Sequence, residues 1–112
     1  MAEDREVPEG AAVFPLIPAE LGVHPLLLAV LHAVVFLDGS DEAAVQPDAA
    51  AEALEYVAGY LQRLKGSELN RLREDLQTLL TFAKQEKWDR SAVQFLKRFL
   101  SDFGIAEVEE SD

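Results

Sequence analysis

The stretch Ser67–Lys87 reads SELNRLREDLQTLLTFAKQEK, and the spacing of its apolar residues decides the fold class. Their positions alternate steps of three and four residues, at Leu69, Leu72, Leu76, Leu79 and Ala83. This alternation places the side chains on one face of an α-helix. Ser67 suits the N-terminal cap, so we expect a helix that continues to about Lys87.

The same spacing appears on both sides of this stretch. Upstream it includes Ala50, Leu54, Val57, Leu61 and Leu64, and downstream it includes Ala92, Leu96, Phe99 and Phe103. We expect the upstream helix to open at Pro47-Asp48, run to Lys65 and stop at Gly66. The downstream helix should run from Arg90 to Asp102, with Asp89 as its cap and Gly104 as its stop.

Two apolar segments precede these helices. The first, residues 11–18, reads AAVFPLIP, and its two prolines favour an extended strap that covers a groove between helices. The second begins near His24-Pro25 and runs as a helix to about Leu37. Because it is apolar at nearly every position, this helix is expected either to be central or to contact a second copy of the chain.

The sequence therefore predicts an all-α fold, a small four-helix bundle with an extended, proline-containing N-terminal strap and an acidic C-terminal tail. The chain has 112 residues and 49% hydrophobic residues, enough for one domain with its own core. We expect a flexible acidic N-terminus over residues 1–10, a single helical domain over 11–104 and the tail over 105–112.

Charge is unevenly distributed along the chain, whose net charge is −11. Residues 1–62 contain eleven acids and one base, Arg5, whereas residues 63–98 contain nine bases and five acids. Residues 99–112 add five acids and no base. An acidic protein is a poor match for nucleic acid, since phosphate contacts depend on Lys and Arg. The field of the protein favours a basic protein as partner.

Several classes of protein are disfavoured by composition. The chain has no cysteine, which excludes disulfides and thiolate metal sites and fits the cytoplasm. Its first ten residues are acidic, unlike a secretory signal. The longest apolar stretch, Leu26–Leu37, is short of the roughly 20 residues that span a membrane. We expect a cytoplasmic protein that binds neither membrane nor nucleic acid.

No motif indicates catalysis, a metal or a cofactor. His24 and His32 are eight residues apart, unlike the helical metal ligands, which are three or four apart. The loop Asp38–Glu42 alternates oxygen-bearing side chains, but its glycine position does not fit a calcium loop, and Ala49 occupies the place of the bidentate glutamate. We therefore expect no enzyme activity, no metal site and no cofactor.

The second predicted helix carries the best candidate binding surface. Asp48, Glu52 and Glu55 form an acidic stripe opposite the apolar seam, and Asp41 and Glu42 precede it. Such a stripe is also what an ordinary solvated helix face looks like. Tyrosine and arginine, two of the residue types that dominate interface energies, flank the seam of the same helix. The predicted partner-binding residues are Asp41, Glu42, Asp48, Glu52, Glu55, Tyr56, Tyr60 and Arg63.

These features predict a small acidic helical module for protein–protein interaction. In profile the chain is similar to the four-helix immunity proteins of the nuclease colicins, which implies neutralisation of a basic toxin. Tyr56 and Tyr60, however, are four residues apart and lack a following proline, unlike the tyrosine pair of that family, so no residue role is carried over. An alternative is a structural or self-associating adaptor that dimerises through the apolar first helix. A ligand carrier with an internal site is a third reading.

Overall fold

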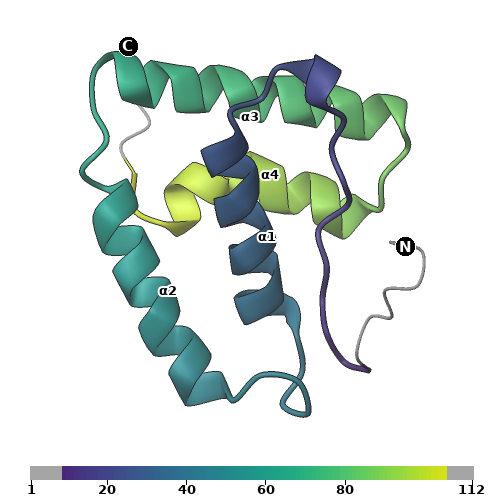
Figure 1. The fold of residues 1–112 in the computed structure, drawn as a ribbon, viewed down its shortest axis with the longest axis vertical. Helices are drawn as coiled ribbons and strands as arrows, with labels where there is room; N and C mark the ends of the chain where they lie inside the picture. Colours follow the sequence, from purple (N-terminus) through teal and green to yellow (C-terminus); the bar gives the residue numbers. More distant parts are fainter. Residues whose placement is uncertain (1–8, 106–112) are drawn as a thin grey trace. The chain divides into compact units, whose positions relative to one another are not determined.

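The structure is a computed structural model that describes residues 9–105. The helices are η2 (Ala19–Leu21), α1 (Pro25–Gly39), α2 (Pro47–Leu61), α3 (Ser67–Gln85) and α4 (Arg90–Asp102), as Figure 1 shows. Residues 9–105 contain no β-strand, and the predicted all-α class is confirmed. The predicted acidic tail, apart from Ile105, and most of the predicted flexible N-terminus lie outside the described residues.

The chain divides into two compact units. The first unit contains Met1–Pro18 and Pro25–Tyr56, and the second contains Ala19–His24 and Val57–Asp112. The prediction of a single domain over residues 11–104 stays a prediction.

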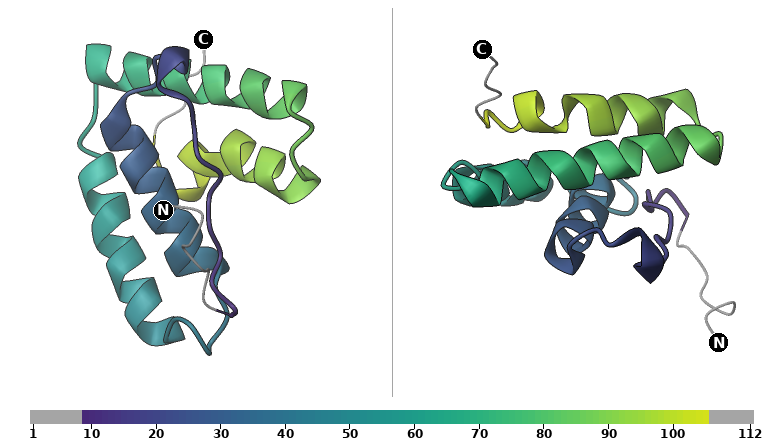
Figure 2. Two further views of the ribbon diagram at one scale, coloured as in Figure 1. Left: turned by 45° about the vertical axis from the view of Figure 1, so that its right-hand side comes forward. Right: turned by 90° about the horizontal axis from the view of Figure 1, so that it is seen from above.

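The second unit is built on α3 and α4, which pack side by side in both views of Figure 2. The apolar stripe predicted from the sequence forms the interior of this pair. Buried on α3 are Leu72, Leu76, Leu79 and Ala83, and buried on α4 are Leu96 and Phe99. Phe99 contacts Phe95 and Phe103, with ring centroids 5.8 and 5.0 Å apart. Burial of such side chains stabilises a fold by about 1.5–3 kcal/mol each.

Both helices of this pair end in the same hydrogen-bonded motif. At the end of α4, Ile105 N donates to Leu100 O and Gly104 N donates to Ser101 O, with Gly104 at φ 71°. At the end of α3, Trp88 N donates to Ala83 O, and the left-handed position is taken by Lys87 at φ 58°. These are Schellman motifs, which satisfy the last carbonyl groups of a helix. Gly104 thus ends its helix as predicted.

The predicted end of the second helix and the predicted caps need correction. Helix α2 ends at Leu61, not Lys65, because the chain tightens there: Arg63 N donates to Tyr60 O at 3.0 Å, a bond that spans three residues. Gly66 is not the stop of α2 but the residue that precedes α3, at φ 62°. Ser67 is the first helical residue of α3, which has no side-chain cap. Asp89 precedes α4 as predicted, although its carboxylate accepts from Ser91 Oγ instead of a backbone amide.

In the first unit, α1 buries one side and exposes the other. The buried residues are Leu27, Leu31 and Val34, three to four residues apart. The helix begins at Pro25, as predicted, since a proline at the first position sacrifices no hydrogen bond. It continues two residues beyond the predicted end, to Gly39.

The proline-containing segment has no regular secondary structure over residues 11–18. Phe14 is buried, and its ring meets that of His32 edge-on at 5.2 Å. The segment is fixed near its start, because Ala12 N donates to Ser40 Oγ at 2.8 Å and Asp41 N donates to Gly10 O at 2.9 Å. Its predicted role as a strap over a groove between helices stays a prediction.

Candidate functional site

The first unit carries a surface of one charge sign. Its described residues, 9–18 and 25–56, contain seven carboxylate side chains and no Lys or Arg. Five of these carboxylates belong to the predicted site and all five are exposed; we call them the acidic surface, and they are Asp41, Glu42, Asp48, Glu52 and Glu55. In the described part of this unit, no cation dilutes their field.

The helical part of the acidic surface follows from the register of α2. Asp48, Glu52 and Glu55 are spaced by four and three residues, so they share one face of the helix. Ala50, which is buried, lies on the opposite side. Tyr56 follows next to the carboxylates, with 62% of its surface exposed. A large aromatic ring beside a row of acids gives this face an apolar contact as well as charge.

The loop part of the acidic surface is held by local hydrogen bonds. Asp41 Oδ1 accepts from Ala43 N at 2.9 Å, and Asp41 O accepts from the amides of Ala44 and Val45 at 3.0 Å. Gln46 Oε1 accepts from Ala49 N at 2.8 Å and so caps the start of α2. Together these hydrogen bonds fix the positions of Asp41 and Glu42 relative to the first turn of α2.

Beside this loop the first unit has a groove of about 360 Å³. Its polar lining includes Asp38, Asp41 and Glu42, and its apolar lining includes Leu37, Val45, Ala50 and Leu54. The groove therefore joins three carboxylates to a set of aliphatic side chains. A positively charged side chain with an apolar stem, such as lysine or arginine, matches both parts.

Tyr60 and Arg63, the other two predicted site residues, belong to the second unit. The guanidinium carbon of Arg63 lies 4.8 Å from the centroid of the Tyr60 ring, in a cation–π arrangement. Both residues are exposed. The structure thus pairs these two with each other, and the charged part of the candidate site consists of the acidic surface alone.

Sequence reasoning missed a buried carboxylate in the second unit. Asp75 is only 6% exposed, and Arg71 Nε lies 3.0 Å from each of its carboxylate oxygens. His24 N donates to Asp75 Oδ2 at 3.0 Å, and Arg71 Nη2 donates to Gly22 O at 2.9 Å. The i, i+4 spacing of Arg71 and Asp75 was a visible signal for an ion pair. The backbone groups that complete the network, the amide of His24 and the carbonyl of Gly22, lie about fifty residues away in sequence, and no local pattern indicates them.

The structure contains a second groove, between α3 and α4, that the sequence did not predict. In residues 9–105, no group of three or more His, Asp or Glu side chains is placed to hold a metal ion. Across the same residues, no helix has the length and apolar character needed to cross a membrane.

No protein-family model, curated protein or solved structure matches this chain.

Proposed function

We propose that this chain is a protein-binding module that recognises a basic protein through its acidic surface. The observation that carries the proposal is the set of exposed carboxylates in a unit whose described residues lack Lys and Arg. Acids at the start of α2 suit the helix dipole, but only the first turn benefits from it. Glu52 and Glu55 lie beyond that turn, so the dipole does not account for them.

Electrostatic complementarity would set the speed and specificity of this interaction. A field of one sign raises the rate at which an oppositely charged partner arrives, and it rejects partners of like charge. Affinity would come from desolvated apolar contacts. Tyr56 and the aliphatic lining of the groove at the α1–α2 loop supply such contacts next to the carboxylates.

A concrete version of this function is an immunity or antitoxin protein that neutralises a cationic nuclease. Carboxylates on the inhibitor would occupy the positions that the nuclease uses for phosphates. In this role the chain works in the cytoplasm, has no catalytic activity of its own and needs no cofactor. The absence of cysteine and the small, acidic, helical character of the chain support this version.

Charge reversal tests the proposal. The probe is a fluorescein-labelled amphipathic peptide with leucines along one face and lysines beside them, measured by fluorescence anisotropy. We expect the triple variant Asp48→Lys, Glu52→Lys, Glu55→Lys to bind at least about tenfold more weakly than the natural chain. Helicity by circular dichroism should change little, because all three residues are exposed and only Asp48 lies in the first turn of α2.

The matched control is Glu68→Lys, Glu74→Lys, Glu86→Lys, which makes the same charge change at exposed positions of the second unit. Equal loss of affinity in both variants would mean that binding depends only on net charge, and it would overturn the acidic surface as the binding site.

The immunity version has its own test. Co-expression with the product of a neighbouring gene should protect cells from that product, and the triple variant should not.

One observation favours a second function, self-association through α1. Leu26 and Phe36 are 71% and 39% exposed, and the exposed Ala29 and Ala33 lie between them. Steps of three, four and three residues place these four side chains on one face. Small residues between larger ones let two helices approach closely, and an exposed apolar face of this kind is typical of an interface.

Sedimentation equilibrium tests self-association. A chain that uses this face should remain dimeric at micromolar concentration, and the double variant Ala33→Glu, Phe36→Glu should be monomeric. Leu16→Glu is the control, because Leu16 is an exposed apolar residue outside α1. A natural chain that is monomeric at about 100 μM would remove this function.

A further inference from the structure

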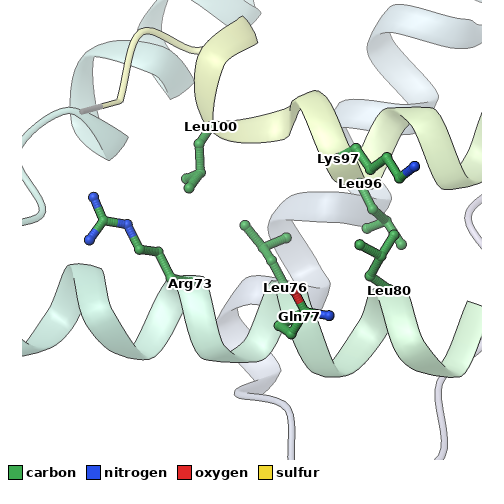
Figure 3. Close-up of a pocket in the computed structure, with 7 residues that line it drawn as sticks. All are labelled: Arg73, Leu76, Gln77, Leu80, Leu96, Lys97 and Leu100. Carbon is green, nitrogen blue, oxygen red and sulfur yellow. The ribbon is translucent and has the colours of Figure 1, made fainter. Parts of the chain in front are cut away.

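The second unit carries a groove whose chemistry is opposite to that of the acidic surface. It lies between α3 and α4 and has a volume of about 310 Å³. Figure 3 shows side chains from both helices reaching into the space between them, from α3 Leu76 and Leu80 and from α4 Leu96 and Leu100. Leu76 and Leu96 are buried and form the bottom, whereas Leu80 and Leu100 are half-buried and form the walls. The groove thus offers an aliphatic floor.

Cations stand on both rims of this floor. Arg73 and Lys97 line the groove itself, one from each helix. Lys84 is eleven residues after Arg73 on α3, and Arg90 is seven residues before Lys97 on α4, spacings that return to the same side of a helix. Between Arg73 and Lys84 the groove is lined by Leu76, Gln77 and Leu80, none of which is charged. No carboxylate lines the groove among the described residues.

Three of the four rim cations are available to pair with a ligand. Within residues 9–105 the side-chain ion pairs join Arg71 to Asp75 and Arg98 to Asp102. Lys84, Arg90 and Lys97 are exposed and make no ion pair with another described residue. Since the leucines cannot interact favourably with phosphates, the groove does not suit a nucleic acid backbone. It suits a ligand that is apolar along its centre and negatively charged along its edges.

We propose that the α3–α4 groove binds an acidic amphipathic helix of a partner protein. Leucine-type side chains on the helix would fill the floor, and its Glu and Asp residues would face Arg73, Lys84, Arg90 and Lys97. The stretch from Arg73 to Lys84 covers about 16 Å of helix, so about three turns of a partner helix fit along it. Seating an amphipathic helix in an apolar groove is a common mode of peptide recognition.

This inference is independent of the proposed function, because it uses the other unit and the opposite sign of charge. With both surfaces in use, the chain joins one basic and one acidic partner. The two proposals can be refuted independently, because the acidic surface is tested with a basic peptide and the groove is tested with an acidic one.

The probe for the groove is a fluorescein-labelled helical peptide of about 16 residues, with leucines at i, i+4, i+7 and i+11 and glutamates beside them. A second peptide has lysine at each glutamate position. By fluorescence anisotropy, the full chain should bind the acidic peptide, and raising NaCl from about 50 to about 300 mM should weaken this binding. The double variant Arg73→Glu, Lys97→Glu should bind at least about tenfold more weakly.

The matched control is Lys65→Glu, Lys87→Glu, which reverses two exposed cations of the same unit that do not line the groove. It should retain binding within about twofold. Amide chemical-shift changes in the NMR spectrum should cluster at Leu76, Gln77, Leu80 and Lys97 when the acidic peptide is added. Shifts confined to other segments, or equal losses in the control, would overturn the proposal.

Two further results would show that something else occupies the groove, and either would overturn the proposal that a partner helix binds there. The first is concentration-dependent self-association of the natural chain that Arg73→Glu, Lys97→Glu abolishes, which would identify a second copy as the occupant. The other is a rise of about tenfold in affinity for the acidic peptide in the variant Glu107→Gln, Glu109→Gln, Glu110→Gln. That rise would mean that residues 106–112 of the chain compete for the groove.

Discussion

Trp88 meets Phe82 edge-on across the turn that ends α3, with ring centroids 6.0 Å apart and planes at 86°. The contact joins the last turn of the helix to the residue that follows its left-handed position. Hydrophobic contacts of this kind often accompany a Schellman motif. Here the left-handed residue is Lys87 instead of the usual glycine.

Replacing Lys87 by glycine should therefore stabilise the protein. A left-handed conformation costs an L-residue about 1–2 kcal/mol, and glycine avoids most of this cost while losing some entropy on folding. We expect Lys87→Gly to raise the free energy of unfolding by about 0.5–1 kcal/mol in urea titrations. Gln77→Gly, at an exposed helical position, should instead lower it by about 0.5–1 kcal/mol. A loss of stability in Lys87→Gly would contradict the φ of 58° at this position.

Loss of the Asp75 carboxylate should lower the free energy of unfolding by more than the loss of one ion pair would. Asp75→Ala leaves the amide of His24 and the guanidinium of Arg71 without their partner, and it should lower the free energy of unfolding by about 1–3 kcal/mol. Asp75→Asn keeps one acceptor oxygen and should lower the free energy of unfolding by less than Asp75→Ala does. The adjacent, exposed Glu74 provides the control, since Glu74→Ala should change stability by less than about 0.5 kcal/mol. Equal effects of the Asp75 and Glu74 alanine variants on the urea midpoint would contradict the buried network.

Truncation of a buried leucine tests the interior of the α3–α4 pair. Leu79 is 0% exposed, so Leu79→Ala should lower the free energy of unfolding by about 2–5 kcal/mol through lost burial and a residual cavity. Leu16 is 78% exposed, and Leu16→Ala should be close to neutral. Thermal unfolding followed by circular dichroism compares the two. Similar melting temperatures for both variants would mean that Leu79 is not in a packed interior.

Two glycines have the same backbone conformation but different surroundings. Alanine substitutions at these positions therefore distinguish backbone strain from steric crowding of the new side chain. Gly104 and Gly22 have φ of 71° and 76°, so alanine is strained at both. A Cβ on Gly104 would lie 2.9 Å from Gln62 Nε2, whereas nothing lies within 4 Å of one on Gly22. Gln62 Nε2 also donates to Phe103 O at 2.8 Å. We expect Gly22→Ala to lower the free energy of unfolding by about 1 kcal/mol, and Gly104→Ala to lower it further because the Gln62 amide must move. Equal urea midpoints for the two variants would show that Gln62 adjusts without cost.

Helix boundaries show where sequence reasoning succeeded and where it failed. The start of α1 at Pro25 and the end of α4 before Gly104 were predictable, because proline and glycine act through their own backbone geometry. The end of α2 was placed four residues too late, at Lys65 instead of Leu61. Leu64 continues the apolar spacing, but the chain has already left the helix, at the point where the side chain of Gln62 bonds to the backbone of Phe103. A contact between residues so far apart in sequence leaves no local signal.

The residues of the candidate site likewise include features that could be predicted from the sequence and features that could not. The exposure of Asp48, Glu52 and Glu55 could be predicted, since their spacing opposite the apolar seam depends only on helix periodicity. The pairing of Tyr60 with Arg63 could be anticipated as a helical neighbour contact, but its separation from the acidic surface into the second unit could not.

By itself, the sequence determined the presence of four helices, the side that the three amphipathic ones bury and the segregation of acids and bases along the chain. These properties are local, because a helix repeats every 3.6 residues whatever surrounds it. Only the tertiary structure decided that segment 19–24 closes over Asp75 and that α3 and α4 leave a leucine-floored, cation-rimmed groove between them. Both depend on which distant segments approach each other, and such an approach is set by the packing of side chains from different helices.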